Sequence, residues 1–594
     1  MGRLRLGFAA SAAIFALGAV AAHADETKAV VEGVADKSLR QAIERYIGTV
    51  KRAPQSRVQA RRRAEEAADD ATTVLRSEGY YDATVTPDLT AADHPKPLLR
   101  IDPGPRSRLA DPKVSWANQA PSEKAAAEAV AAMKLATGAP GRAADIVGAE
   151  GRIVGALQHD GYPDADAQPR EVVVDHADHT LRPTFRVDAG SLVHFDGVQV
   201  KTAGRTNPAW VGQLAPWRKE QVYSPEPVAE LERRLLDTGV YDSVTVGLSP
   251  TADAQGLRPV VVSLADRARA TVALGASYST TEGPGVNGRY TLYNRLHRAD
   301  TLTLSAQYAS MLKEVALELS LPHWRKPQHT LRIGATAIQD DTDAFQEKSA
   351  GVHVDLEHRF AKTSFLTYGV SAEFSHNDEK TLVAGQIVGK RRNLALLTGL
   401  ARLSLDRSNN LLNPSQGWRF DGRIEPTLGA GDQTLVYARA QAQLTGYVPL
   451  TKSGSTVIAG RVKLGSILSG AATLDVPAPQ RFFAGGGGSI RGYSYQGVGP
   501  RFPDNTPIGG QSLAETSLEV RQTFGRQWGV VAFVDAGTVG AQKYPDFRTF
   551  SVGAGVGIRY DLGFGPLRAD IATPLNRRPG DPPVVVYLSI GQAF

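Results

Sequence analysis

The chain has 594 residues, of which 42% are hydrophobic and none is cysteine, and its formal net charge is +6. This length predicts several domains, and the lack of cysteine excludes disulfides as a source of stability. A mild charge without clustered stripes of Lys and Arg argues against a nucleic-acid partner.

The N-terminus has the pattern of a secretory signal peptide. Arg3 and Arg5 precede an apolar run over residues 6–22, and Ala22-His23-Ala24 forms a small-x-small cleavage pattern. A membrane anchor is the alternative, but the run is short for one. Residues 1–24 are therefore predicted to be removed on export. No later apolar stretch is long enough for a transmembrane helix, which leaves a periplasmic, secreted or outer-membrane protein.

A short motif recurs about every 80 residues in the N-terminal part. Its three copies are Gly79-Tyr80-Tyr81-Asp82, Gly161-Tyr162-Pro163-Asp164 and Gly239-Val240-Tyr241-Asp242. Each copy follows a segment with helical periodicity, and each glycine falls where a helix end favours a left-handed residue. An extended piece precedes each pair of helices, and two strand-like segments follow each motif. The predicted order is strand-helix-helix-strand-strand, three times.

This order resembles the polypeptide-transport-associated repeat, called POTRA. The resemblance predicts α+β periplasmic POTRA domains over residues 25–108, 109–190 and 191–266. The alternative is a set of α+β periplasmic modules of no particular family. Helices on one face of a small sheet leave one sheet edge open to an added strand.

From about residue 267 to residue 594 the helical period gives way to alternation. In Val352-His353-Val354-Asp355-Leu356-Glu357, apolar side chains would face lipid and polar ones a wet interior. Sixteen candidate strands begin near residues 270, 288, 300, 314, 329, 349, 364, 392, 417, 433, 456, 512, 528, 550, 566 and 583. An even number is typical of a closed single-chain barrel, so we predict a 16-stranded antiparallel transmembrane β-barrel.

The connections and the last strand agree with a barrel. Connections on the external side should be long, among them residues 377–391 and, longest of all, the sixth external loop over about 470–511. Ser589, Gly591 and the terminal Phe594 match the C-terminal signal of outer-membrane barrels, in which an aromatic side chain sits at the membrane interface.

The sixth external loop contains four consecutive glycines followed by Ile490-Arg491-Gly492-Tyr493. With the repeats and the barrel, this motif resembles the superfamily of outer-membrane insertases and translocators. That resemblance implies partners for Arg491 in the barrel lumen: Glu519 on the twelfth strand, and a Phe-x-Asp-x-Gly motif on the thirteenth, here Phe533, Asp535 and Gly537. An arginine removed from water needs such carboxylates.

Three repeats resemble the TamA branch of this superfamily. The resemblance implies an outer-membrane protein with periplasmic N-terminal domains that inserts or secretes autotransporters and other barrel clients. It also implies a TamB-like partner anchored in the inner membrane and contact with the lipid bilayer. Client strands would pair at the seam between the first and last barrel strands, and with open edges of the repeats. A two-partner secretion transporter is the alternative.

Other functions fit the residues less well. The glycine run lacks the Gly-Lys-Ser/Thr of a phosphate-binding loop. His176 and His179 lie without further obvious metal ligands, and a solvated surface is the better interpretation. An outer-membrane enzyme or a porin would not need three periplasmic modules. No catalytic residue, metal or cofactor is expected.

Overall fold

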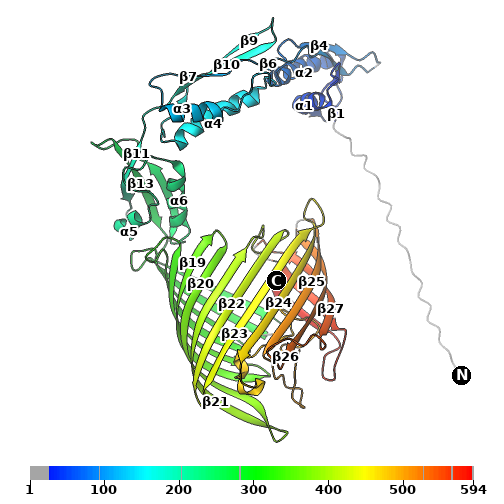
Figure 1. Cartoon of the computed structure of the whole chain (residues 1–594). Helices are drawn as coiled ribbons and strands as arrows, with labels where there is room; N and C mark the ends of the chain where they lie inside the picture. Colours follow the sequence, from blue (N-terminus) through cyan, green and yellow to red (C-terminus); the bar gives the residue numbers. More distant parts are fainter. Residues whose placement is uncertain are drawn as a thin grey trace, which may run out of the picture. The chain divides into compact units, whose positions relative to one another are not determined.

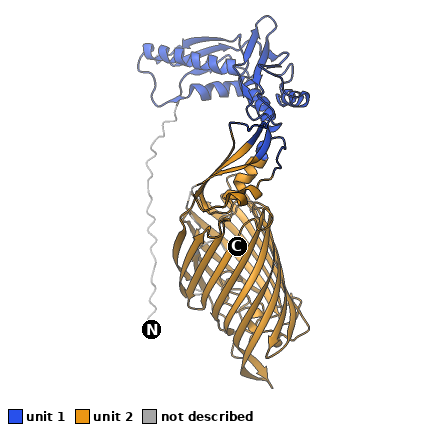
Figure 2. Cartoon of the chain, turned by 90° about the vertical axis from the view of Figure 1, so that its left-hand side faces the viewer, with its two compact units in different colours: residues 1–196, 217–226, 250–258 blue, residues 197–216, 227–249, 259–594 orange. Residues whose placement is uncertain are grey.

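The computed structural model describes residues 26–92, 94–202, 204–279, 283–525, 527–563 and 566–590. The predicted signal peptide lies outside these residues. The chain forms two compact units (Figure 2). Unit 1 holds the residues up to 196 together with 217–226 and 250–258, and unit 2 holds 197–216, 227–249 and the chain from 259 onward. None of the described helices combines the length and apolar character that a membrane span requires.

The first repeat packs two helices on a small sheet (Figure 1). Helices α1 (Lys37–Ile47) and α2 (Arg57–Ser77) follow β2 (Val30–Glu32), and β4 (Thr84–Leu89) and β5 (Pro97–Asp102) complete the sheet in the order β2-β5-β4. A short ladder joins β1 (Glu26–Thr27) to β3 (Thr49–Val50). Small side chains such as Ala67 and Ala71 let α2 lie close to Leu99 and Ile101 in the core.

The second repeat is built around β10 (Thr180–Asp188). This strand pairs in parallel with β6 (Arg108–Leu109) and β7 (Lys113–Trp116), and antiparallel with β8 (Asp166–Ala167) and β9 (Glu171–Asp175). Helices α3 (Glu123–Ala132) and α4 (Ala143–His159) contribute to the same core, in which Ile153, Leu157 and Phe185 are fully buried.

The third repeat has a sheet with the order β11-β13-β12 and two helices. Its strands are β11 (His194–Lys201), β12 (Tyr241–Leu248) and β13 (Leu257–Asp266), and its helices are α5 (Pro208–Gln213) and α6 (Pro225–Leu236). The strand-helix-helix-strand-strand order is thus confirmed.

The recurring motif lies where one repeat meets the next. Within unit 1, the Asp82 carboxylate accepts contacts of 2.5 Å from His176 Nδ1 and 2.8 Å from His179 Nδ1, both on the turn between β9 and β10. Asp164 in the second copy lies 2.5 Å from Nη1 of Arg258, at the start of β13. The motif aspartate therefore contacts the following repeat at both of these joints.

The barrel has sixteen strands in chain order, and every neighbouring pair in that order is antiparallel. This confirms the predicted fold. The strands are β14 (Ala270–Ser279), β15 (Gly283–Tyr293), β16 (Thr301–Ala309), β17 (Leu312–Leu321), β18 (His329–Asp341), β19 (Phe345–Ala361), β20 (Ser364–Val383), β21 (Gln386–Asp406), β22 (Gly417–Gly431), β23 (Leu435–Pro449), β24 (Thr456–Ser469), β25 (Ser512–Phe524), β26 (Trp528–Gly540), β27 (Ser551–Asp561), β28 (Pro566–Pro574) and β29 (Val585–Ile590).

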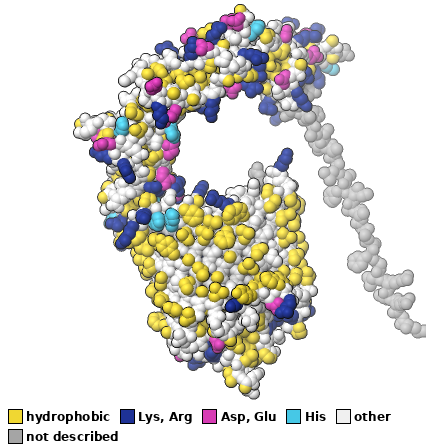
Figure 3. Space-filling model, viewed as in Figure 1, with side chains coloured by type: hydrophobic (Ala, Val, Ile, Leu, Met, Phe, Trp, Pro, Cys, Tyr) yellow, Lys and Arg dark blue, Asp and Glu magenta, His cyan; other side chains and the backbone are white. Residues whose placement is uncertain are grey.

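The two faces of the barrel wall differ as the alternation predicts. Val352 and Val354 are exposed on the outside, whereas Glu357 pairs with Arg332 on the neighbouring strand at 3.0 Å. Hydrophobic side chains cover much of the outer surface on the face seen in Figure 3. An apolar outer band with polar groups inside is the pattern of a membrane-spanning barrel.

The expectation of long external connections is wrong for several hairpins, because residues 310–311, 342–344 and 432–434 are short connections at that end of the barrel. Residues 377–391 are not an external loop but the end of a long hairpin, because β20 and β21 continue to a tight turn at Ala384-Gly385, where both residues have positive φ. Side chains still alternate there, with Asn377 and Glu379 buried. The sequence hides this strand because its outer face is polar as well.

Strands β14 and β29 are the two ends of the sheet. They lie close together, but over the described residues no hydrogen-bonded ladder joins them. The expected closure of the barrel by pairing of its first and last strands is therefore not seen in this part of the chain.

The third repeat and the barrel contact each other within unit 2. Asn294 Nδ2, after β15, donates to Thr206 Oγ1 at 2.8 Å, and Arg359 at the end of β19 lies 2.8 Å from Asp237 after α6. His323, in the turn between β17 and β18, contacts the Arg234 carbonyl of α6 through Nε2 at 3.0 Å. These contacts place the third repeat at the end of the barrel where β15 is joined to β16, β17 to β18 and β19 to β20.

Candidate functional site

The segment between β24 and β25, here called loop 6 (residues 470–511), folds back into the barrel. It contains the 3-10 turns η1 (Thr473–Asp475) and η2 (Ala478–Gln480). Its buried side chains Phe482, Ile490 and Tyr493 pack with apolar residues of the wall such as Leu513 and Val539. Loop 6 is thus part of a hydrophobic core and not a slack connection, in spite of its glycines.

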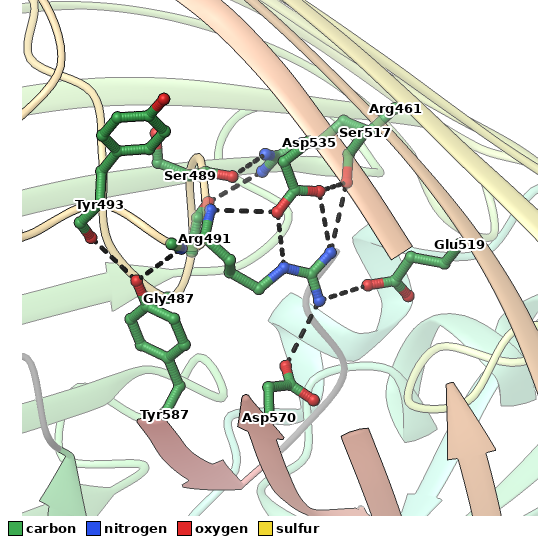
Figure 4. A network of polar contacts seen from close by, with 12 residues as sticks. Arg461, Gly487, Ser489, Arg491, Tyr493, Ser517, Glu519, Asp535, Asp570 and Tyr587 are labelled. Carbon is green, nitrogen blue, oxygen red and sulfur yellow. Dashed lines mark hydrogen bonds and ion pairs between the residues drawn. The ribbon is translucent and has the colours of Figure 1, made fainter. Parts of the chain in front are cut away.

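Arg491 is the centre of the polar contacts of loop 6 (Figure 4). Its Nε and Nη2 atoms lie 2.6 and 2.9 Å from the two carboxylate oxygens of Asp535. Nη1 lies 2.7 Å from Glu519 and 3.3 Å from Asp570. Arg491 is 1% exposed and the three carboxylates are fully buried, so these charges are held away from water. Two parallel contacts to one carboxylate are the strongest arrangement available to arginine.

The ring of Phe533 and two glycines shape the space around this arginine. The guanidinium carbon lies 3.4 Å from the centre of the Phe533 ring, within the range of a cation–π contact. Gly492 has a φ of +100°, and a Cβ there would lie 2.8 Å from the backbone of Thr573. At Gly537, a Cβ would lie 2.5 Å from the carbonyl of Ala514 and 2.7 Å from Ile490. Side chains at these two positions would push loop 6 away from the wall.

The wall also holds the backbone of the glycine run. Arg461 on β24 donates to the carbonyls of Gly488 and Ser489 at 2.9 and 3.0 Å, and Arg568 on β28 donates to the Gly487 carbonyl at 2.6 Å. Without side chains, the glycines leave their carbonyls open to these arginines.

Two tyrosines fasten the chain after Arg491. The Tyr587 hydroxyl on β29 accepts from the Gly492 N–H at 3.0 Å and donates to the Tyr493 carbonyl at 2.8 Å. The Tyr493 hydroxyl donates to Asn576 Oδ1 at 2.6 Å. Loop 6 is therefore attached to the last strand of the sheet as well as to β25, β26 and β28.

The charge balance around Arg491 keeps it protonated. Burial alone would lower the pKa of Arg491, but the hydrogen bonds that Arg491 donates to Asp535 and the charges of Glu519, Asp535 and Asp570 raise that pKa above its usual value. The site therefore holds a permanently charged arginine. No set of three or more His, Asp or Glu residues in the described part of the chain is arranged to hold a metal ion.

The structure brings together all the residues predicted for the loop and its partners: Ile490, Arg491, Gly492, Tyr493, Glu519, Phe533, Asp535 and Gly537. Ser589 of the predicted C-terminal signal lies on β29 opposite Arg568, whereas Gly591 and Phe594 lie outside the described residues. Sequence reasoning missed Asp570, Arg568, Arg461 and Tyr587. The signal for two of them was present, because Arg568 and Asp570 place charges on one face of an otherwise apolar strand.

The chain joins small α+β repeats to a sixteen-strand barrel, and the longest loop of this barrel folds into its interior. These features define the class of POTRA-containing β-barrel proteins. Residues 294–594, just over half of the chain, match the Omp85 superfamily domain, so the protein belongs to the Omp85 superfamily. Residues 28–103 match the POTRA domain described as TamA domain 1.

The related sequences are distant. The chain is 23% identical over 429 residues to the outer membrane protein assembly factor BamA of Neorickettsia risticii, covering 69% of this chain and 56% of that protein. It is 20% identical over 472 residues to BamA of Neisseria meningitidis serogroup B, covering 70% and 58%. The chain thus spans a little over half the length of these curated relatives.

A solved structure supports the fold. The crystal structure of BamA from Haemophilus ducreyi lacking POTRA domains 1-3 is similar with a TM-score of 0.68 and 19% identity, covering 82% of this chain and 99% of that one. At this identity, the similarity shows the shared architecture.

Proposed function

We propose that the protein is an outer-membrane insertase or translocase that helps unfolded β-barrel clients, autotransporters among them, to assemble or cross. Its repeats would lie in the periplasm and its barrel in the lipid bilayer. The observation that carries the proposal is the seam at which β14 and β29 lie close together without pairing over their described residues. Unpaired backbone groups in lipid cost several kcal/mol each, so a client strand that pairs there gains stability.

The assignment to the TamA branch is the finer part of the proposal. It is supported by three repeats before the barrel and by the match of residues 28–103 to a POTRA domain of that type. A TamB-like protein anchored in the inner membrane would then be the partner. Strand templating requires neither catalytic residue nor cofactor, so the protein would act without enzymatic chemistry.

Insertion by the purified protein is the direct test. The protein is reconstituted in liposomes, an unfolded autotransporter barrel is added, and its folding is followed by the shift in gel mobility of unheated samples. We expect faster client folding than in empty liposomes. Folding no faster than in empty liposomes would contradict the proposal.

The seam can be tested with the same assay, because the chain has no cysteine of its own. Cysteine pairs placed along β14 and β29 and joined by a short cross-linker should abolish the acceleration. The matched control joins Ala276→Cys on β14 to Val286→Cys on β15, two residues that already face each other in a paired ladder. Equal loss in both variants would show that the seam has no special role.

The alternative is a two-partner secretion transporter, and the protein encoded beside this chain distinguishes it from the proposed insertase. A dedicated secreted protein encoded beside this chain would favour it, and a TamB-like neighbour would favour the proposal.

A further inference from the structure

A second polar cluster, which shares no residue with the contacts of Arg491, fastens loop 6 to the long hairpin of β20 and β21. Its members are Glu379 on β20, Arg392 on β21 and Arg481 in loop 6, which are 5%, 1% and 3% exposed. The hairpin turn lies at the end of the barrel opposite to the third repeat, since β20 starts beside the short turn that follows β19.

Glu379 joins the wall to the first half of loop 6. Its Oε2 atom accepts from Arg481 Nη2 at 2.9 Å and from the backbone N–H of Ala478 at 2.8 Å. Its Oε1 atom accepts from Nε of Arg392. One carboxylate therefore accepts hydrogen bonds from two buried arginines and from one backbone N–H of loop 6.

Other donors of the two arginines bind backbone carbonyls of loop 6, and Arg392 Nη1 also donates to Gln433 Oε1 at 2.6 Å. Arg481 donates to Val476 at 2.8 Å and to Ile508 at 2.9 Å, so it ties the outgoing and the returning limb of loop 6 together. Arg392 donates to the carbonyls of Asp475, at 2.9 Å, and Leu474. The next residue of the hairpin adds a contact to the returning limb, because the Lys380 amine lies 2.6 Å from Asp504.

The energetics of this cluster depend on Glu379. Burial lowers the pKa of Arg481 to about 10, and the charge of Glu379 opposes that shift. Truncation of the carboxylate would leave both buried arginines without an ion-pair partner among the described residues, which is the costly way to break a buried pair.

We propose that Glu379 is a positioning residue that forms a second anchor of loop 6. It holds the limbs of loop 6 across the external end of the barrel, and it acts separately from the anchor at Arg491. This inference concerns how loop 6 is held, and it stands whether or not the protein inserts clients.

The test uses two buried reporters in the full-length protein, both at positions that are 0% exposed in the native chain. The first reporter is Val476→Cys, near Glu379, and the second reporter is Ile490→Cys, beside Arg491. Each reporter cysteine is labelled with a maleimide in detergent. Its labelling rate in the folded protein is divided by its labelling rate in the unfolded protein. In Glu379→Gln, we expect the first reporter to label at least about tenfold faster, because two buried donors lose a charged partner. The second reporter should change by no more than about twofold, as independent sites do.

A coupling measurement identifies the partner. Arg481→Gln removes one of the two arginines that Glu379→Gln leaves unneutralised. The rise in the labelling rate of the first reporter in the double variant should therefore be smaller than the product of the two single rises. The matched control is Asp378→Asn, one residue before Glu379, whose carboxylate pairs with the exposed Arg391 at 2.9 Å. That control should leave both reporters unchanged.

Three results would overturn the proposal: an unchanged labelling rate of the first reporter in Glu379→Gln, a parallel rise at both reporters, or single effects that simply multiply. A parallel rise would mean that loop 6 opens as one body or that the whole barrel is weakened. If Glu379→Gln does not fold, Arg481→Gln alone carries the test, because it leaves Glu379 and Arg392 as a matched pair. It must then expose the first reporter selectively.

Discussion

The substitution Arg491→Ala is the sharpest test of how loop 6 is held. It leaves Glu519 with Arg521 at 2.8 Å, and Asp570 with Arg559 and Arg568. Asp535 differs, because among the described residues Arg491 is its only ion-pair partner. The substitution therefore leaves one buried carboxylate without an ion-pair partner among the described residues, and not three.

The expected magnitude follows from that single stranded charge. Breaking a buried ion pair by removing one partner costs roughly 3–5 kcal/mol. Since about 1.4 kcal/mol is tenfold in an equilibrium, loop 6 should open roughly 140 to 4,000 times more often. The loss of the contact with Phe533 acts in the same direction, but it is not added because neighbouring contributions do not sum.

Maleimide labelling of Ile490→Cys measures this opening, with the gel mobility of unheated protein showing that the barrel remains folded. Asp535→Asn combined with Arg491→Ala should recover part of the protection, because the stranded charge is gone. Arg548→Ala is the matched control, since its side chain is 91% exposed and pairs with Asp546 within the same external loop. A labelling rate in Arg491→Ala that equals that of this control would refute the reasoning.

Three further predictions concern other parts of the molecule. Burial lowers the pKa of His323, whose neutral ring contacts the third repeat. The contact should therefore be complete above pH 6.5, about the pKa of histidine in the unfolded chain. It should weaken as the pH falls from there toward the lower pKa of the folded state. Hydrogen exchange of α6 should report the change, and His323→Gln should remove its pH dependence. Asp82→Asn should widen the distribution of distances between spin labels on the first two repeats, whereas Asp88→Asn, exposed and paired within its own repeat, should not. Gly492→Ala should destabilise the closed position of loop 6 by roughly 1–3 kcal/mol, because residue 492 has a positive φ and lies close to the wall. The labelling assay should therefore show faster opening of loop 6. Gly488→Ala is its control, since a Cβ there meets nothing within 4 Å.

Each of these has an outcome that contradicts it. A pH-independent exchange rate of α6 down to pH 5 would show that His323 does not control the contact. Equal distance distributions for the two aspartate variants would remove the motif from the joint. Equal labelling of the two glycine variants would show that close approach at residue 492 does not hold loop 6.

The sequence by itself determined the architecture, because periodicity is local. A period of about 3.6 followed by alternation separates the repeats from the barrel, and turn residues between apolar runs place most strands within a few positions. The strand beyond residue 377 was missed because it extends past the apolar band, where neither of its faces needs to be hydrophobic. The partners of Asp82 and Asp164 could not be read from a local pattern either, because they lie on the next repeat.

Only the tertiary structure decided what loop 6 touches. Arg491 and its partners Glu519 and Asp535 could be named in advance from the resemblance to a family, but not Asp570 or Tyr587. Nor could the second anchor be named, because Glu379 and Arg481 are 102 residues apart and look like ordinary surface charges in the sequence. Burial turns such charges into anchors, since an ion pair matters most where water cannot replace it. Which charges are buried together is set by the way the sheet curves around loop 6, and no local pattern records it.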